Sequence, residues 1–154
     1  STFPTWNTVP GVFANLISGN ATVIKPHPKS IMPIAIVVAE MQKVLVENGL
    51  SPYTVQLAVD TVAKPITKDL AEHKDIKLID YTGGTTFGDY IESIPRKTVF
   101  TEKAGVNSVI LESVKDPKAV FGNLAFSFSL YSGQMCTAPQ NIFVPADGIK
   151  TAEG

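Results

Sequence analysis

The stretch Ala21–Lys25, which reads Ala-Thr-Val-Ile-Lys, decides the fold predicted for this chain. Its three consecutive β-branched residues favour a buried strand. Pro26 and Pro28 end that strand, because proline cannot donate a hydrogen bond to a sheet. Ser30 then stands at a helix N-cap position, and apolar residues recur at helical spacing until Asn48-Gly49 closes the helix. A strand followed directly by a helix is the repeating unit of a parallel sheet.

The same alternation continues along the rest of the chain. Further strands are predicted at 54–59, 77–81, 98–102 and 108–111, and helices at 11–18, 66–73, 87–94 and 116–131. Most strands are apolar on both faces, as in parallel sheets that helices cover. We therefore predict an α/β fold, a parallel-sheet three-layer sandwich. Ligands bind at the carboxyl ends of such strands, which here carry Lys25, residues 81–84 and Glu102.

Composition excludes several classes of partner. The 154 residues are 44% hydrophobic and 18% charged, with a formal net charge of −1, as in a soluble globular protein. That charge gives no reason to expect binding to nucleic acid or to an anionic membrane surface. No apolar run is long enough to span a bilayer, and no secretory signal is visible. A single cysteine suits a reducing cytoplasm, which is the predicted location.

Cys136 is the only cysteine, and it follows Gly133-Gln134-Met135. It therefore has no partner for a disulfide within the chain. In isolation, a lone cysteine is more often a small buried hydrophobic residue. A thiol beside a small turn, between two apolar runs, also suits a nucleophile that a substrate must reach. This stretch by itself leaves both interpretations open.

Two strand ends could bind an anionic cofactor. Thr82-Gly83-Gly84-Thr85 joins a predicted strand to a predicted helix, where glycines allow close approach and the helix N-terminus favours phosphate. An ordinary tight turn is the alternative, since no G-x-G-x-x-G fingerprint is present. Lys25 could reach a ribose or a phosphate, and the alternative is a solvated strand end.

Two further polar residues could take part in catalysis. Glu102 ends a predicted strand, and a carboxylate near an active thiol can accept a proton from the thiol or from water. Asn7 follows Trp6, and its amide can donate a hydrogen bond to a developing oxyanion. A surface charge and a polar loop residue are the plain alternatives. No residues have the spacing of metal ligands, so no metal is expected.

Taken in chain order, these segments resemble the motifs of the aldehyde dehydrogenase superfamily. The separation of Glu102 and Cys136, 136 − 102 = 34 residues, is also similar to that family's spacing. The matching segments are Phe3-Pro4-Thr5-Trp6-Asn7, residues 18–26, residues 81–88, Glu102-Lys103-Ala104-Gly105 and Gly133-Gln134-Met135-Cys136. Within the superfamily, three segments look most like the phenylacetic acid degradation (PaaN) subfamily: Pro4-Thr5-Trp6-Asn7, Lys25-Pro26-His27-Pro28 and Gly133-Gln134-Met135-Cys136-Thr137-Ala138-Pro139-Gln140.

The resemblance implies a role for each motif. Cys136 would attack an aldehyde carbon, hydride would pass to NAD or NADP, and Glu102 would activate the water that hydrolyses the resulting thioester. The Asn7 side chain and the backbone N–H of Cys136 would hold the oxyanion. Lys25 would contact the adenosine ribose of the cofactor. The turn formed by Gly83, Gly84 and Thr85 would lie near the pyrophosphate, with Thr85 supplying the hydroxyl of the serine that Gly84 replaces.

One departure from the family bears on the choice of cofactor. Pro28 stands where many NAD-preferring members carry a glutamate that binds the ribose hydroxyls. Without that carboxylate to repel a 2′-phosphate, NADP+ is expected to bind at least as well as NAD+. The short interval from Asn7 to Lys25 implies a trimmed helix between them.

The resemblance also implies how the chain is organised. Residues 1–101 would be part of the NAD(P)-binding domain, and residues 102–154 would open the catalytic domain of a longer, homo-oligomeric enzyme acting on a small aldehyde. A first alternative keeps the fold but makes or reduces a coenzyme A thioester or an acyl phosphate; Glu102 argues against it, because acylating relatives typically lack that base. A second alternative is an inactive fragment.

Overall fold

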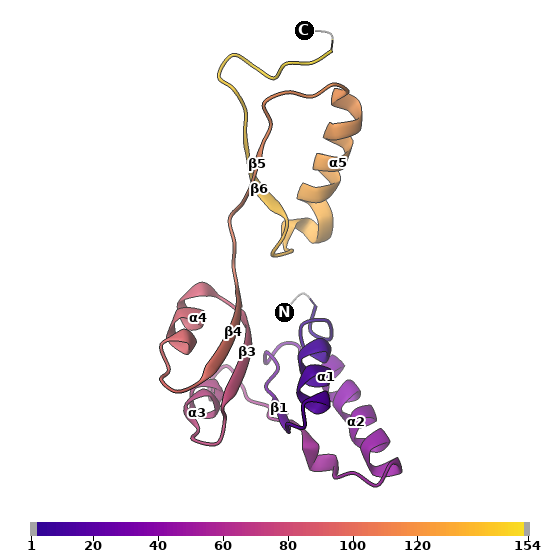
Figure 1. The fold of residues 1–154 in the computed structure, drawn as a ribbon, viewed down its shortest axis with the longest axis vertical. Coiled ribbons are helices and arrows are strands. Elements are labelled where there is room, and N and C mark those ends of the chain that lie inside the picture. Colours follow the sequence, from indigo (N-terminus) through magenta and orange to yellow (C-terminus); the bar gives the residue numbers. More distant parts are fainter. Residues whose placement is uncertain (1–2, 153–154) are drawn as a thin grey trace. The chain divides into compact units, whose positions relative to one another are not determined.

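The computed structural model describes residues 3–152, which form two compact units (Figure 1). The first unit extends from Phe3 to Glu102, and the second begins at Lys103. Each unit contains helices and paired strands, so the predicted α/β class is confirmed. The strands are hydrogen-bonded two by two, as β1–β2, β3–β4 and β5–β6.

In chain order, the first unit begins with a helix, a short strand and a second helix. These elements are α1 (Val9–Ile17), β1 (Thr22–Ile24) and α2 (Ile31–Glu47). Both helices end beside a glycine in the left-handed region, Gly19 at φ +80° and Gly49 at φ +72°, where a Cβ would be strained. Apolar residues of the helices and strands form one buried cluster, Val12, Ile24, Ile34, Val38 and Val55.

A parallel pair of strands places two charged residues at the same sheet edge. After the 3-10 turn η1 (Pro52–Thr54), β2 (Val55–Leu57) pairs with β1 in the register Thr22↔Val55 to Ile24↔Leu57. The N–H of Ala58 continues the pairing by donating to the Ile24 carbonyl at 2.9 Å. Because the strands run the same way, the residues that follow them, Lys25 and Asp60, meet at their carboxyl ends.

The rest of the first unit repeats the alternation of helix and strand. Its elements are α3 (Thr67–Glu72), β3 (Leu78–Gly83), α4 (Thr85–Glu92) and β4 (Thr98–Lys103). The N–H of Thr98 donates to the Lys77 carbonyl at 2.9 Å, which joins the two strands where each begins. Gly83 and Glu102 therefore lie toward the same end of this strand pair.

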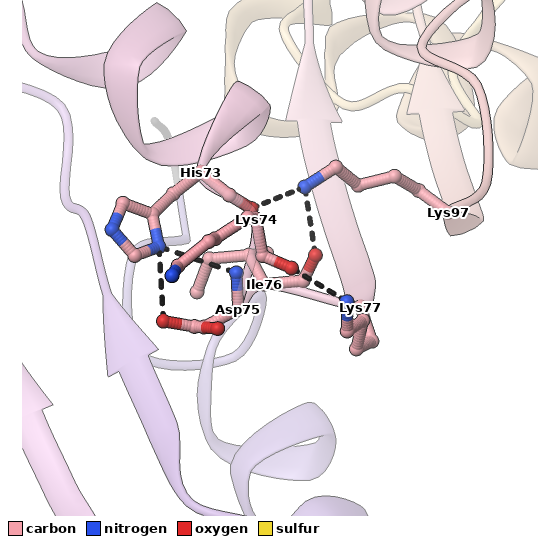
Figure 2. Close-up of polar contacts among 6 residues, drawn as sticks. All are labelled: His73, Lys74, Asp75, Ile76, Lys77 and Lys97. Atoms are coloured by element: carbon pink, nitrogen blue, oxygen red, sulfur yellow. Dashed lines mark hydrogen bonds and ion pairs between the residues drawn. The ribbon is translucent and has the colours of Figure 1, made fainter.

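Lys97 holds the connection between α3 and β3 in place (Figure 2). Its ammonium donates to the carbonyls of His73 at 2.6 Å and Ile76 at 2.7 Å. Lys77 acts locally in the same way, donating to the Lys74 carbonyl at 2.6 Å. These bonds satisfy carbonyls that belong to no helix or strand, so two lysines serve structure here.

The second unit is one helix and one strand pair. Its elements are β5 (Asn107–Ile110), α5 (Pro117–Ser129), the short 3-10 helix η2 (Leu130–Gly133) and β6 (Pro139–Phe143). β5 and β6 are parallel, with a register irregularity between Asn107 and Ser108. The Asp116 carboxylate caps α5 by accepting from the N–H groups of Lys118 and Ala119, as its position before Pro117 predicts.

Two local predictions are corrected. β3 was expected to end at Tyr81, but it continues through Gly83. A glycine suits that position, because a Cβ there would collide with the Tyr81 hydroxyl. Ser30 precedes α2 as predicted, but its side chain makes no cap hydrogen bond within the described residues. Its backbone N–H instead donates to the His27 carbonyl at 2.8 Å.

Candidate functional site

Cys136 lies in an exposed turn between η2 and β6. The chain reaches it through three successive residues of positive φ: Tyr131 at 50°, Ser132 at 57° and Gly133 at 71°. Non-glycine residues held in this conformation cost about 1–3 kcal/mol each, and such strain gathers at functional sites. An accessible thiol at the end of a strained segment favours the nucleophile interpretation over that of a buried hydrophobic residue.

Asn107 supports this turn from the neighbouring strand. Its side-chain amide donates to the carbonyl of Cys136 at 2.6 Å and to that of Ala138 at 3.2 Å. Ala138 is buried, and its own N–H donates to the Met135 carbonyl at 3.0 Å. The backbone carrying the thiol is thus fixed while the side chain stays exposed. Sequence reasoning missed Asn107, whose only signal is an amide at the start of a predicted strand.

Gly83 and Gly84 differ in the space available for a side chain. A Cβ at Gly83 would collide with the Tyr81 hydroxyl, which donates to the Gly84 carbonyl at 3.1 Å. A Cβ at Gly84 would meet nothing within 4 Å. Gly84 is the N-cap of α4, and within the described chain no side chain caps this helix. The first N–H groups of α4, beginning at Thr85, are therefore available to an anion.

Glu102 is exposed on β4 and lies near a second carboxylate, Asp80 on β3. Partial desolvation, followed by the charge of Glu102, raises the pKa of Asp80 above its ordinary value. Asp80 also lies against α1, since a Cβ on Gly11 would come within 2.6 Å of its Oδ2. The predicted base therefore has a carboxylate neighbour that no sequence motif indicated.

Lys25 is a paired residue and not a solvated strand end. Its ammonium lies 2.8 Å from Oδ1 of Asp60, and the side chains are 18% and 0% exposed. The other carboxylate oxygen of Asp60 accepts from the N–H of Ile66 at 3.1 Å. Burial by itself would raise the pKa of Asp60, but the Lys25 hydrogen bond, the Ile66 N–H and the charges of Lys25 and His27 together hold that pKa below its ordinary value.

Asn7 is exposed in the turn before α1. Its backbone N–H donates to the Phe3 carbonyl at 3.0 Å, and the neighbouring Thr8 hydroxyl donates to the Pro4 carbonyl at 2.7 Å. These bonds define the turn that presents the Asn7 side chain. Its role as an oxyanion donor stays a prediction.

The candidate residues divide between the two units. In the first unit Lys25 follows β1, and residues 83–85 and Glu102 lie at the carboxyl ends of β3 and β4. Cys136 belongs to the second unit. The cooperation of Glu102 with Cys136 therefore stays a prediction from their spacing.

Two other features are absent from the described residues. In the segment 3–152, no group of three or more histidine, cysteine, aspartate or glutamate side chains could hold a metal ion. Between the same limits, no helix combines the length and the apolar character that crossing a bilayer requires.

Comparison with known proteins gives one consistent result. Residues 2–151 match the aldehyde dehydrogenase family. A crystal structure of an NAD-dependent aldehyde dehydrogenase from Burkholderia multivorans is 51% identical, with a TM-score of 0.93 over 99% of this chain and 28% of that one. The NADP complex of an NADP-dependent glyceraldehyde-3-phosphate dehydrogenase from Bacillus halodurans is 28% identical, with a TM-score of 0.71, over 86% of this chain and 27% of that one.

A curated relative matches over a similar span. Aldehyde dehydrogenase LUC3 from Fusarium is 26% identical over 145 residues, which are 92% of this chain and 30% of the relative. The chain thus spans less than a third of the length of each of these proteins.

Proposed function

The chain belongs to the aldehyde dehydrogenase family, and from that premise we propose that the whole protein oxidises a small aldehyde to its carboxylic acid with NAD+ or NADP+. The observation that carries the proposal is the exposed Cys136 thiol, held on a strained turn whose backbone Asn107 fixes. Residues 1–101 would serve the cofactor, and residues 102–154 would open the catalytic domain.

The cofactor residues have the chemistry that a dinucleotide requires. Lys25 would hold the adenosine ribose, and the N-terminus of α4, with Gly84 at its cap and Thr85 in its first turn, would lie near the pyrophosphate. Gly83 would act indirectly, because it makes room for the Tyr81 side chain that bonds to Gly84. When bound, the nicotinamide supplies the acceptor for the hydride that aldehyde oxidation releases.

The catalytic steps follow from the side chains. The Cys136 thiolate would form a bond from sulfur to the aldehyde carbon, while the Asn7 amide and the Cys136 N–H hold the resulting oxyanion. Oxidation of this adduct leaves a thioester on Cys136. Glu102 would then take a proton from water as the water oxygen bonds to the thioester carbon, and cleavage of the carbon–sulfur bond releases the acid.

The substrate is proposed from the motifs that resemble the phenylacetic acid degradation subfamily. Those motifs support an aldehyde formed in the breakdown of an aromatic compound. We also propose that the whole protein is a cytoplasmic homo-oligomer, as the family resemblance implies.

The test is aldehyde-dependent formation of reduced nicotinamide by the purified whole protein, with the products identified by mass spectrometry. We expect the free acid in water, and a faster reaction with an arylacetaldehyde than with an aliphatic aldehyde of similar size. Product that appears only with coenzyme A or phosphate would replace hydrolysis with acyl transfer. No oxidation of any aldehyde would overturn the proposal.

A further inference from the structure

We propose that Asp60 is a positioning and specificity residue. It holds the Lys25 ammonium at the sheet edge and offsets its charge, so that the site favours a ribose 2′-hydroxyl over a 2′-phosphate. The inference rests on the proposed function, because it requires that Lys25 contact the adenosine ribose. It adds a residue, and a consequence for the choice of cofactor, to that role.

The geometry of the pair supports positioning. Both oxygens of Asp60 are occupied, Oδ1 by the Lys25 ammonium at 2.8 Å and Oδ2 by the Ile66 N–H at 3.1 Å. The carboxylate is therefore anchored to backbone and cannot turn away without losing a bond. A lysine ammonium has three N–H donors. When one of them points to Asp60, the other two remain for a ligand, which can reach the ammonium because the Lys25 side chain is 18% exposed.

The electrostatics of the pair support specificity. The Asp60 side chain is fully buried, so water screens its charge weakly. Together the ammonium and the carboxylate carry no net charge, and such a pair attracts a phosphate less than a free lysine would. A hydroxyl needs only a hydrogen bond, which the ammonium still provides. His27 is the other titratable side chain whose electrostatic field acts on Asp60.

This arrangement changes the expectation drawn from Pro28. That expectation assumed that no carboxylate lies near Lys25, since Pro28 offers none. The structure places the Asp60 carboxylate there, 35 positions later in the chain (60 − 25 = 35), from the neighbouring parallel strand. The absence of a glutamate at position 28 should favour NADP+ binding, and the negative charge of Asp60 beside Lys25 should oppose that effect.

The experiment compares equilibrium dissociation constants of NAD+ and NADP+, measured by calorimetry on the whole protein and on Asp60→Asn. Asparagine keeps an oxygen for the Ile66 N–H but removes the charge. We expect the affinity for NADP+ relative to NAD+ to rise roughly fivefold or more. The matched control is Asp75→Asn, which makes the same charge change on a side chain that is 73% exposed and should leave the ratio within about twofold.

Two further variants separate electrostatics from packing. Asp60→Glu keeps the charge and should keep the wild-type ratio; a ratio that moves as far as in Asp60→Asn would overturn the proposal. Lys25→Met with Asp60→Leu removes both charges, so affinity for both cofactors should fall while their ratio stays within about twofold. This pair of changes decides the question even if Asp60→Asn fails to fold. Wild-type protein that binds neither cofactor would overturn the proposed function, whereas an unchanged ratio in Asp60→Asn would overturn this inference alone.

Discussion

The two units of the chain hold their candidate residues in different ways. The first unit has a continuous apolar cluster from α1, β1, α2 and β2, and an ion pair at the edge of the sheet that this cluster supports. Among residues 3–152, all the buried hydrophobic residues except Val114 and Ala138 belong to the first unit. The second unit fixes the Cys136 backbone with hydrogen bonds from Asn107 and leaves much of α5 exposed.

The difference teaches what each proposed task requires. The cofactor contact proposed for Lys25 requires a rigid side chain, and the buried Asp60 carboxylate holds the Lys25 ammonium in place. A nucleophile has to be reachable, and local hydrogen bonds can define its backbone without covering the thiol. Side-chain packing therefore positions the residue proposed to bind the cofactor, and turn geometry positions the residue proposed to form a covalent bond with the substrate.

The largest effect is expected in the second unit. Cys136→Ala in the whole protein should lower aldehyde oxidation by at least ~10⁴-fold, because no other thiol of this chain can replace it. Cofactor binding, measured by calorimetry, should be unchanged. Met135→Leu, beside it in the same turn, is the control and should remain active. Substantial turnover by Cys136→Ala would contradict the proposal that Cys136 is the nucleophile.

The next effect is at the last residue of the first unit. Glu102→Gln should still produce reduced nicotinamide in the first turnover but then stall at the thioester, with the steady-state rate lower by ~10²–10⁴-fold. Rapid mixing resolves the two phases. The control is Glu112→Gln, an exposed carboxylate outside the proposed site. A steady-state rate within about twofold of wild type would argue against a general base here.

The third prediction concerns stability. Lys25→Met leaves the fully buried Asp60 carboxylate without its cation, so the free energy of unfolding should fall by about 3–5 kcal/mol. Urea denaturation followed by circular dichroism measures it. Lys29→Met, at an exposed position nearby, should change the value by less than about 0.5 kcal/mol. Equal effects of the two variants would mean that the ion pair does not anchor the first unit.

A smaller effect tests the turn of the second unit. Gly133→Ala puts a Cβ at φ +71° and within 3.3 Å of the Phe128 carbonyl oxygen, which should cost about 1–2 kcal/mol and change the rate at which Cys136 reacts with a thiol reagent. Gly122→Ala is the control, since a Cβ there meets nothing within 4 Å in the middle of α5 and should stabilise that helix by about 0.5–1 kcal/mol. Identical thiol reactivity in both would weaken the argument from turn geometry.

The smallest expected effect is a dependence of folding stability on pH. The pKa of Asp60 is lower in the folded chain than its ordinary value of 3.8, so the unfolded chain takes up a proton first as the pH falls. The stability that Asp60 contributes is present above about pH 4 and is lost as the pH falls through the folded pKa. Stability measured between about pH 6 and 3 should therefore decline less steeply in Asp60→Asn. A slope equal to that of wild type would contradict the pairing; Asp80, whose pKa is raised, acts in the opposite direction in both proteins.

Local pattern was enough to predict most helices and strands. The apolar spacing after Ser30 predicts α2, and Asp116-Pro117 predicts the start of α5, because both depend on neighbours within a few residues. Strand ends were less predictable. The glycines after Tyr81 predicted a turn, yet β3 continues through Gly83, where a Cβ would collide with the Tyr81 hydroxyl.

The candidate site was predictable only in part. Glycines, lysines and a lone cysteine near predicted strand ends can be recognised in the sequence, so Lys25 and Cys136 could be predicted as candidate site residues. Their partners Asp60 and Asn107 come from neighbouring strands, and single-sequence periodicity does not reveal strand pairing. The available signal was an aspartate directly after the strand predicted at 54–59, which gains meaning only once β1 and β2 are known to be adjacent.

Lys97 has a consequence for local motion. One ammonium bonds to two carbonyls of the segment 73–76, although Lys97 itself immediately precedes β4. In terms of amide hydrogen exchange, that segment and the start of β4 should open together as one cooperative unit, because neither can move far while the lysine bridges them. Acetylation of Lys97 would remove the charge and two of its donors, so it would uncouple the two openings and leave the segment to exchange at the rate of an ordinary surface loop.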